Sequence, residues 1–151
     1  MINTNFMQKA IEIALKSGED MPIGAVLVKN NQVIALAHNE KEHLNQASKH
    51  AEMIVIEEAS KKFQNWRLED CTLYVTLEPC PMCAWAILQS RIKEVYFGSF
   101  DNLYGALGSK LDLRTYLNSK TIVKGGILEE ECDNLLKKYF EKIRNDNKTK
   151  S

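Results

Sequence analysis

The sequence lacks the features that mark membrane proteins, secreted proteins and strongly charged binding proteins. No apolar run approaches the roughly 20 residues that a membrane-spanning helix needs. The first residues, MINTNFMQKA, have neither the basic start nor the apolar stretch of a secretory signal. Formal net charge is +0, so the chain as a whole gives no sign of a nucleic-acid partner. With no internal repeats either, its 151 residues predict a soluble cytoplasmic protein with a single domain over residues 1–151.

Charge is nevertheless uneven near the C-terminal end. From residue 137 onward, six basic residues face two acidic ones. Four of the basic residues are candidate RNA contacts: Lys137, Lys138, Lys142 and Arg144. The commoner explanation of such a bias is a solvated helix face.

Hydrophobic periodicity predicts an opening helix, a hairpin of two strands, and then alternating helices and strands. The expected helices cover residues 6–14, 51–63, 81–91 and 127–143, and the expected strands cover residues 25–28, 33–37, 73–77, 95–97 and 121–123. Asn30 and Asn31 suit the hairpin turn, and residues 38–49 are expected to form a polar loop. This pattern predicts an α/β fold of three layers (α/β/α), with a mixed five-stranded sheet between helices on both faces.

The segment LEPCPMC places Cys80 and Cys83 three residues apart. That spacing alone fits a redox dithiol, a zinc clamp or a pair of iron–sulfur ligands. Because Pro81 is favourable at the first position of a helix, Cys80 is expected at a helix start with Cys83 on the same face. The positive end of that helix favours thiolates, which suit zinc.

Only three histidines are available to complete such a site. His38 and His43 fall in the expected polar loop and are interpreted as surface residues. His50 stands at the start of another expected helix, and two helix starts can converge at one sheet edge. His50, Cys80 and Cys83 are therefore candidate ligands of a zinc ion with an open fourth position, as in catalytic zinc sites.

Glu52 gives this candidate site a group that can carry protons. Zinc lowers the pKa of a bound water to about 7, and a neighbouring carboxylate can take that proton and return it to a leaving group. Since residues two apart do not share a helix face, His50 must lie at the junction of loop and helix if both side chains point into one pocket. The arrangement predicts hydrolytic deamination. A redox dithiol would leave Glu52 unexplained, and Cys71 and Cys132, the remaining thiols, are interpreted as core residues.

His-x-Glu followed by Pro-Cys-x-x-Cys is the signature of the zinc-dependent deaminases of the cytidine/deoxycytidylate deaminase superfamily. Within it, the sequence resembles the bacterial tRNA-specific adenosine deaminases from about residue 6 to residue 144. The segments that carry the resemblance are MPIGAV (21–26), HN (38–39), HAE (50–52), WRLEDCTLYVTLEPCPMCAWAI (66–87), Asp101 with GALGS (105–109), and GGILEEECDNLLKKYF (125–140). The resemblance implies a cytidine deaminase-like fold and conversion of the wobble adenosine of tRNA anticodons to inosine.

The same resemblance implies roles for individual residues and partners. His50, Cys80 and Cys83 would hold Zn²⁺, and Glu52 would shuttle protons. The residues assigned to substrate are Met21, Ile23, Asn39, Ala51 and Asp101. Asn39 would hydrogen-bond the flipped adenine, and Asp101 would contact the sugar next to it. The implied partners are a tRNA anticodon stem-loop and a second copy of the chain, as a homodimer.

Four positions depart from the family pattern. Lys49 ends a segment, QASK, where the family usually has DPTA before the metal histidine. Leu103 replaces a lysine that binds phosphate, Glu141 replaces a basic residue, and Trp85 replaces a small one. These departures affect the expected RNA contacts and pocket rim rather than the zinc chemistry.

Two other functions share part of this pattern. A deaminase of guanine, cytosine or dCMP has the same metal motifs, but Asn39, Asp101 and the basic last helix favour tRNA. A zinc-stabilised RNA-binding module without turnover has no use for Glu52.

Overall fold

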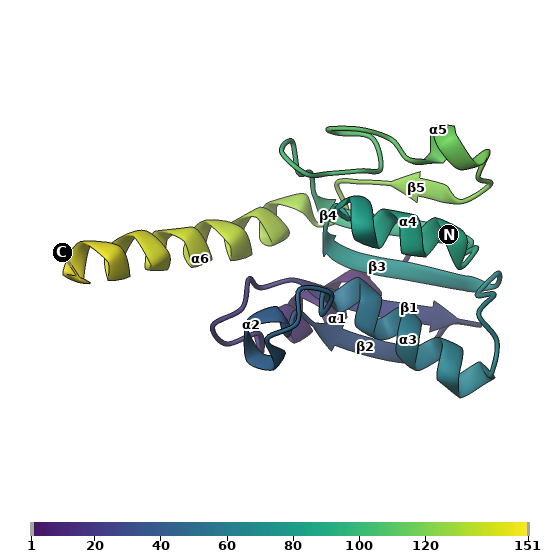
Figure 1. The fold of residues 1–151 in the computed structure, drawn as a ribbon, viewed down its shortest axis with the longest axis horizontal. Helices are drawn as coiled ribbons and strands as arrows, with labels where there is room; N and C mark the ends of the chain where they lie inside the picture. The colour runs from purple at the N-terminus through teal and green to yellow at the C-terminus, as the bar shows by residue number, and fades with distance from the viewer. Residues whose placement is uncertain (1, 151) are drawn as a thin grey trace.

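A computed structural model describes the backbone of residues 2–150 and is organised around one five-stranded sheet (Figure 1). The strands are β1 (Gly24–Lys29), β2 (Gln32–His38), β3 (Cys71–Leu77), β4 (Glu94–Ser99) and β5 (Ile122–Lys124). Their order is β2-β1-β3-β4-β5. β1 runs antiparallel to β2 and β3, whereas β3, β4 and β5 are parallel. The predicted mixed sheet is confirmed.

Helices cover both faces of this sheet, so the predicted three layers are confirmed (Figure 1). The helices are α1 (Thr4–Ala14), α2 (Lys41–Leu44), α3 (Ala51–Phe63), α4 (Pro81–Gln89), α5 (Arg114–Leu117) and α6 (Glu129–Lys150). α3 and α4 pack on one face, where Leu27, Leu73 and Val75 point. α1 and the first turns of α6 pack on the other, against Val26 and Tyr74. β1 is buried on both sides, which explains its unbroken apolar sequence.

The hairpin between β1 and β2 turns at Asn30 and Asn31, whose φ angles are 51° and 61°. Two consecutive positive φ angles are what a two-residue hairpin turn needs, and asparagine tolerates them better than most residues. The turn predicted from these asparagines is confirmed.

Two short helices were not expected. α2 lies inside the segment 38–49, which was wrongly predicted to be loop throughout, and α5 follows the long loop after β4. Four residues are too few to give a helical period. What holds the first turn of α2 is Asp20, whose carboxylate accepts the N–H groups of Glu42 (2.8 Å) and His43 (3.3 Å). A partner so distant in sequence leaves no local signal.

The last helix, predicted over residues 127–143, runs from Glu129 to Lys150 and projects away from the sheet (Figure 1). Its apolar stripe is only partly covered. Cys132 and Leu135 are buried against the sheet, whereas Phe140 and Ile143 are 44% and 36% exposed. No helix in the described part of the chain is long and apolar enough to cross a membrane.

Candidate metal centre

The N-termini of α3 and α4 meet near the C-terminal end of β3. Cys80 is the N-cap of α4, with Pro81 in the first turn, and His50 is the N-cap of α3. Both have extended backbone angles, φ −73° and ψ 173° for Cys80 and φ −77° and ψ 151° for His50. The junction position that the His-x-Glu pattern required of His50 is therefore confirmed.

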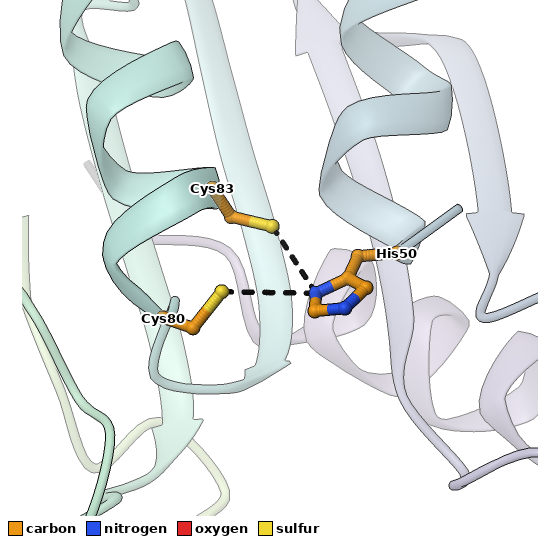
Figure 2. A group of neighbouring side chains, drawn as sticks. All are labelled: His50, Cys80 and Cys83. Carbon is orange, nitrogen blue, oxygen red and sulfur yellow. Dashed lines mark hydrogen bonds between the residues drawn. The ribbon is translucent and has the colours of Figure 1, made fainter. Parts of the chain in front are cut away.

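The side chains of His50, Cys80 and Cys83 converge from these two helices (Figure 2). Nδ1 of His50 lies 3.7 Å from Cys80 Sγ and 3.4 Å from Cys83 Sγ, and all three ligand atoms lie within 4.8 Å of one another. Sulfur and nitrogen ligands of a tetrahedral zinc ion, at about 2.3 and 2.0 Å from it, are roughly 3.5 Å apart. The donor set and its spacing thus fit zinc.

The protonation of the three groups also fits a cation site. The hydrogen bond with Cys83 lowers the pKa of Cys80 to about 4, and the same contact together with burial raises the pKa of Cys83. The hydrogen bond with Cys80 raises the pKa of His50. Two thiolates this close repel each other, so one keeps its proton until a cation compensates both charges.

Glu52 lies in the first turn of α3 and is buried, with 4% of its surface exposed. Burial raises the pKa of its carboxyl group to about 7, and its side chain is within hydrogen-bonding reach of Cys83. Its Oε1 has no hydrogen-bond partner among the described residues. A buried carboxyl oxygen without a partner is costly, and its position beside the ligands gives it access to a reacting group there.

Asn39 joins three segments behind this centre. Its N–H donates to the carbonyl of Ile23 (3.1 Å), and its Oδ1 accepts the N–H of Ala51 (2.8 Å). The amide oxygen therefore caps α3 at a point where the His50 side chain makes no capping hydrogen bond. The NH₂ group of Asn39 is therefore the part of its side chain that can donate a hydrogen bond to a substrate.

The other residues assigned to substrate differ in exposure. Ala51 is fully buried and Ile23 is 7% exposed within the core, whereas Met21 is half-buried at the edge of the core. Asp101 lies in the loop after β4, where its Oδ1 accepts the N–H groups of Leu103 and Tyr104, both at 3.0 Å.

Glu78 is a buried residue of this region to which the sequence pattern assigns no role. It stands between β3 and Cys80, is 2% exposed, and accepts hydrogen bonds from the backbone of Asp101, Leu107 and Ser109. A charged residue directly after an apolar strand was the available signal, but its partners lie more than 20 residues away and have no pattern of their own.

The four candidate RNA contacts, Lys137, Lys138, Lys142 and Arg144, are all exposed on α6. The structure places them on the projecting helix rather than at the metal ligands (Figure 1). A cavity of about 730 Å³ lies between the end of α4 and the start of β5, and none of its lining residues belongs to the metal centre.

Comparisons with known proteins agree with this geometry. Residues 2–99 match the family model described as the cytidine and deoxycytidylate deaminase zinc-binding region. A tRNA-specific adenosine deaminase of Bacillus subtilis (strain 168) is 48% identical over 143 residues, which are 92% of this chain and 89% of that protein.

Two solved structures are also similar. One, from a study of A-to-I editing by tRNA:A34 deaminases at the wobble position of transfer RNA, superposes with a TM-score of 0.82 at 38% identity, covering 89% of this chain and 100% of that one. A guanine deaminase from Bacillus subtilis has a TM-score of 0.63 at 36% identity, with 66% of each chain covered. The chain belongs to the zinc-binding cytidine and deoxycytidylate deaminase family and, within it, to the tRNA-specific adenosine deaminases.

Proposed function

We propose that this protein hydrolyses the wobble adenosine of a tRNA anticodon to inosine. Water replaces the amino group at C6 of the adenine ring, and ammonia leaves. The observation that carries the proposal is the buried Glu52, with its unpartnered Oε1, beside the converging His50, Cys80 and Cys83. The comparisons narrow this deaminase chemistry to tRNA adenosine, because the 48% identical relative carries that activity in its name.

Different side chains would bind the metal and transfer the protons. His50 Nδ1 and the sulfurs of Cys80 and Cys83 would hold zinc, which when bound lowers the pKa of water so that a nucleophile exists at neutral pH. Glu52 takes the proton from the attacking water and delivers it to the departing amino group. A pKa raised to about 7 suits both transfers, because a general acid–base works best near the operating pH.

The bound base needs groups that distinguish and orient it. Asn39 presents its NH₂ group to the purine edge, since its oxygen is engaged by Ala51. Met21 packs against the ring. Asp101 contacts the sugar of a flanking nucleotide. An anticodon loop suits such a pocket because its bases are unpaired, so extruding one costs less than it does in a duplex.

We also propose how the protein assembles, how it contacts RNA and where it works. The protein acts as a homodimer, which is supported by large apolar side chains that stay exposed on α4 and on the loop after β4, among them Trp85 (40%), Leu103 (74%) and Tyr104 (65%). The exposed basic residues of α6 contact phosphates of the anticodon stem. Residues 1–151 work as one deaminase domain in the cytoplasm, where ligand thiols stay reduced.

The test compares ammonia release from anticodon stem-loops with adenosine at the wobble position and from free adenosine, guanine, cytosine and dCMP. We expect the stem-loop to be turned over fastest, because only it offers flanking nucleotides whose binding positions the reacting carbon. Faster turnover of guanine would instead favour the second candidate function, that of a nucleobase deaminase. The observation behind this candidate is the 36% identity to a guanine deaminase.

A further inference from the structure

Glu78 is a buried carboxyl group that the deamination mechanism above does not use. It follows β3 by one residue and precedes the ligand Cys80 by two. Its own N–H donates to the carbonyl of Ser99 (2.9 Å) and so continues the pairing of β3 with β4. The side chain is among the largest that are fully buried in the protein. A buried carboxyl group is tolerated in a folded protein only if hydrogen bonds or ion pairs compensate for its lost hydration.

Four hydrogen-bond donors, all from the segment 101–109, satisfy this carboxylate. Oε1 accepts the N–H of Asp101 (3.1 Å) and the hydroxyl of Ser109. Oε2 accepts the N–H groups of Leu107 (3.2 Å) and Ser109 (3.0 Å). No lysine, arginine or histidine among the described residues forms an ion pair with Glu78. Among the residues that the structure describes, the carboxylate is therefore hydrogen-bonded by this loop alone.

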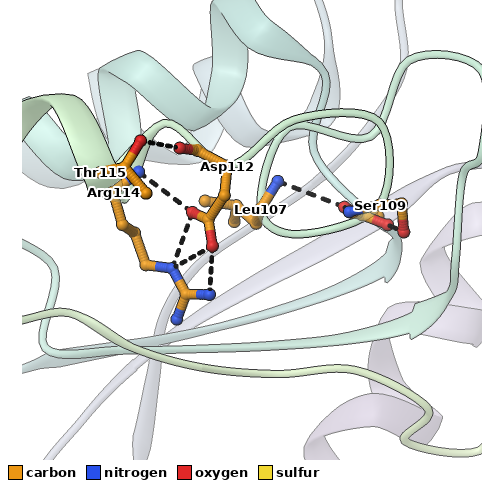
Figure 3. A network of polar contacts seen from close by, with 6 residues as sticks. Leu107, Ser109, Asp112, Arg114 and Thr115 are labelled. Carbon is orange, nitrogen blue, oxygen red and sulfur yellow. Dashed lines mark hydrogen bonds and ion pairs between the residues drawn. The ribbon is translucent and has the colours of Figure 1, made fainter.

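The loop passes so close to Glu78 that its sequence is restricted. A Cβ atom on Gly105 would lie 2.4 Å from Cδ of Glu78 and 2.4 Å from the carbonyl oxygen of Asp101. The next residue, Ala106, donates its N–H to the carbonyl of Pro79 (2.9 Å), so the backbone beside Cys80 also holds the loop. Just beyond this loop, Asp112 and Arg114 form a two-pronged ion pair (Figure 3).

We propose that Glu78 is a positioning residue for the deamination site. It fixes the loop that carries Asp101 relative to the strand end that carries Cys80, and it acts without touching substrate or metal. The proposal rests on the proposed function, because Asp101 can contact a flanking sugar only if the substrate is an RNA with a nucleotide next to the target base. A loop held in this way presents Asp101 in one place, and a displacement of about 1 Å at such a contact can cost roughly 100-fold in rate.

The chemistry of the contact requires a carboxylate. An ionised carboxylate only accepts hydrogen bonds and can take about four of them, whereas a glutamine side chain has one accepting oxygen and an NH₂ group that only donates. In Glu78→Gln the NH₂ group must therefore face at least one backbone N–H group of the loop. It meets the N–H of Asp101 and a Ser109 hydroxyl that can turn to accept, or else the N–H groups of Leu107 and Ser109. The substitution keeps the shape of the side chain and removes one or two of its four hydrogen bonds.

The experiment measures kcat and KM on a wobble-adenosine stem-loop, zinc content and thermal stability for wild type, Glu78→Gln, Asp101→Asn and the double variant. Thr121→Val is the matched control, because it removes a buried hydrogen bond to the carbonyl of Ile92 (2.7 Å) beside the start of β5, away from this loop. Ser109→Ala, which removes one donor of the four, serves as a graded variant.

We expect Glu78→Gln to keep its zinc and to lose about 10- to 100-fold in kcat/KM, with Ser109→Ala losing less. Thr121→Val should lose stability without losing activity. The double variant should be no slower than the slower single variant, since contacts that act through one another are not additive.

Three results would overturn the proposal: additive losses in the double variant, loss of zinc in Glu78→Gln, or equal activity of Glu78→Gln and Thr121→Val. An inactive wild type would instead reject the proposed function, so the two failures are distinguishable.

Discussion

At the scale of single residues, the buried carboxyl group of Glu52 lowers the stability of the folded protein. A buried polar atom without a partner costs about 1–3 kcal/mol, and Oε1 of Glu52 is such an atom among the described residues. A side chain kept in that state beside three groups that could hold a metal is explained by chemistry performed there rather than by packing.

Replacing Glu52 by alanine should separate catalysis from architecture. We expect Glu52→Ala to keep one zinc per chain, because its carboxyl group is not one of the three candidate ligands. Its melting temperature should stay close to that of wild type, because the lost contact with Cys83 is offset by the removal of a buried carboxyl group whose Oε1 has no partner among the described residues. Turnover should fall by at least about 100-fold, the low end for removal of a general acid–base. Metal analysis, calorimetry and an inosine assay measure the three quantities. Substantial remaining activity would exclude Glu52 as the proton carrier.

Replacing a candidate ligand should instead lower the zinc content and the melting temperature. Cys83→Ser should lose most of its zinc and melt several degrees lower, because metal binding and folding are coupled. Cys71→Ser is the matched control: this thiol is equally buried but opens β3 at the opposite end of the strand. A Cys83→Ser protein with full zinc occupancy would contradict the assigned ligand set.

At the scale of secondary-structure elements, the site depends on where α3 and α4 begin. Each helix starts at a candidate ligand, so a bound metal would connect two elements that lie on the same face of the sheet. Asn39 secures the start of α3 through Ala51, and Glu78 secures the loop that faces the start of α4.

Gly105→Ala tests the close approach of that loop. The added methyl group would meet the Asp101 carbonyl and the Glu78 carboxylate at about 2.4 Å, so the loop has to move. We expect lower stability, in the range of about 1–3 kcal/mol for an overpacked site, together with reduced activity on the stem-loop and unchanged zinc. Denaturant unfolding and steady-state kinetics provide the measurements. Wild-type values in both would mean that the loop adapts freely.

The basic residues of α6 give an element-scale prediction about RNA. Changing Lys137, Lys138 and Lys142 to glutamine should weaken stem-loop binding and flatten its salt dependence by about 0.7–0.9 log units for each phosphate that the helix no longer neutralises. Lys9→Gln with Lys16→Gln is the control, because Lys9 lies in the middle of α1 and Lys16 lies two residues after the end of that helix. Equal salt slopes for the triple and the double variant would mean that the α6 residues form only a solvated face.

Much of the fold was predictable because its signals are local. Apolar runs and helical periods predicted all five strands and the four long helices, and Asn30 and Asn31 predicted their turn. The parts that were missed depend on contacts between distant residues. α2 needs Asp20, and the loop after β4 needs Glu78. The convergence of the three candidate ligands was predictable because cysteine and histidine are scarce and their chemistry is specific.

At the scale of the whole molecule, exposed apolar residues on α4 and in the loop after β4 predict self-association. Wild type should have twice the chain mass of 17.2 kDa in light scattering, and Trp85→Glu, on the outer side of α4, should shift the protein toward monomer. If RNA contacts both subunits, that variant should also bind the stem-loop less tightly. A variant that stays fully dimeric would place the interface elsewhere on the surface.

The central claim is the identity of the edited base, and sequencing of tRNA tests it most directly. Purified protein is incubated with intact tRNA that has adenosine at the wobble position, and inosine is located by sequencing, with Glu52→Ala as the inactive control. The account predicts inosine at the wobble position with the wild-type protein and none with the variant. Unchanged tRNA, together with ammonia release from guanine, cytosine or dCMP, would contradict it.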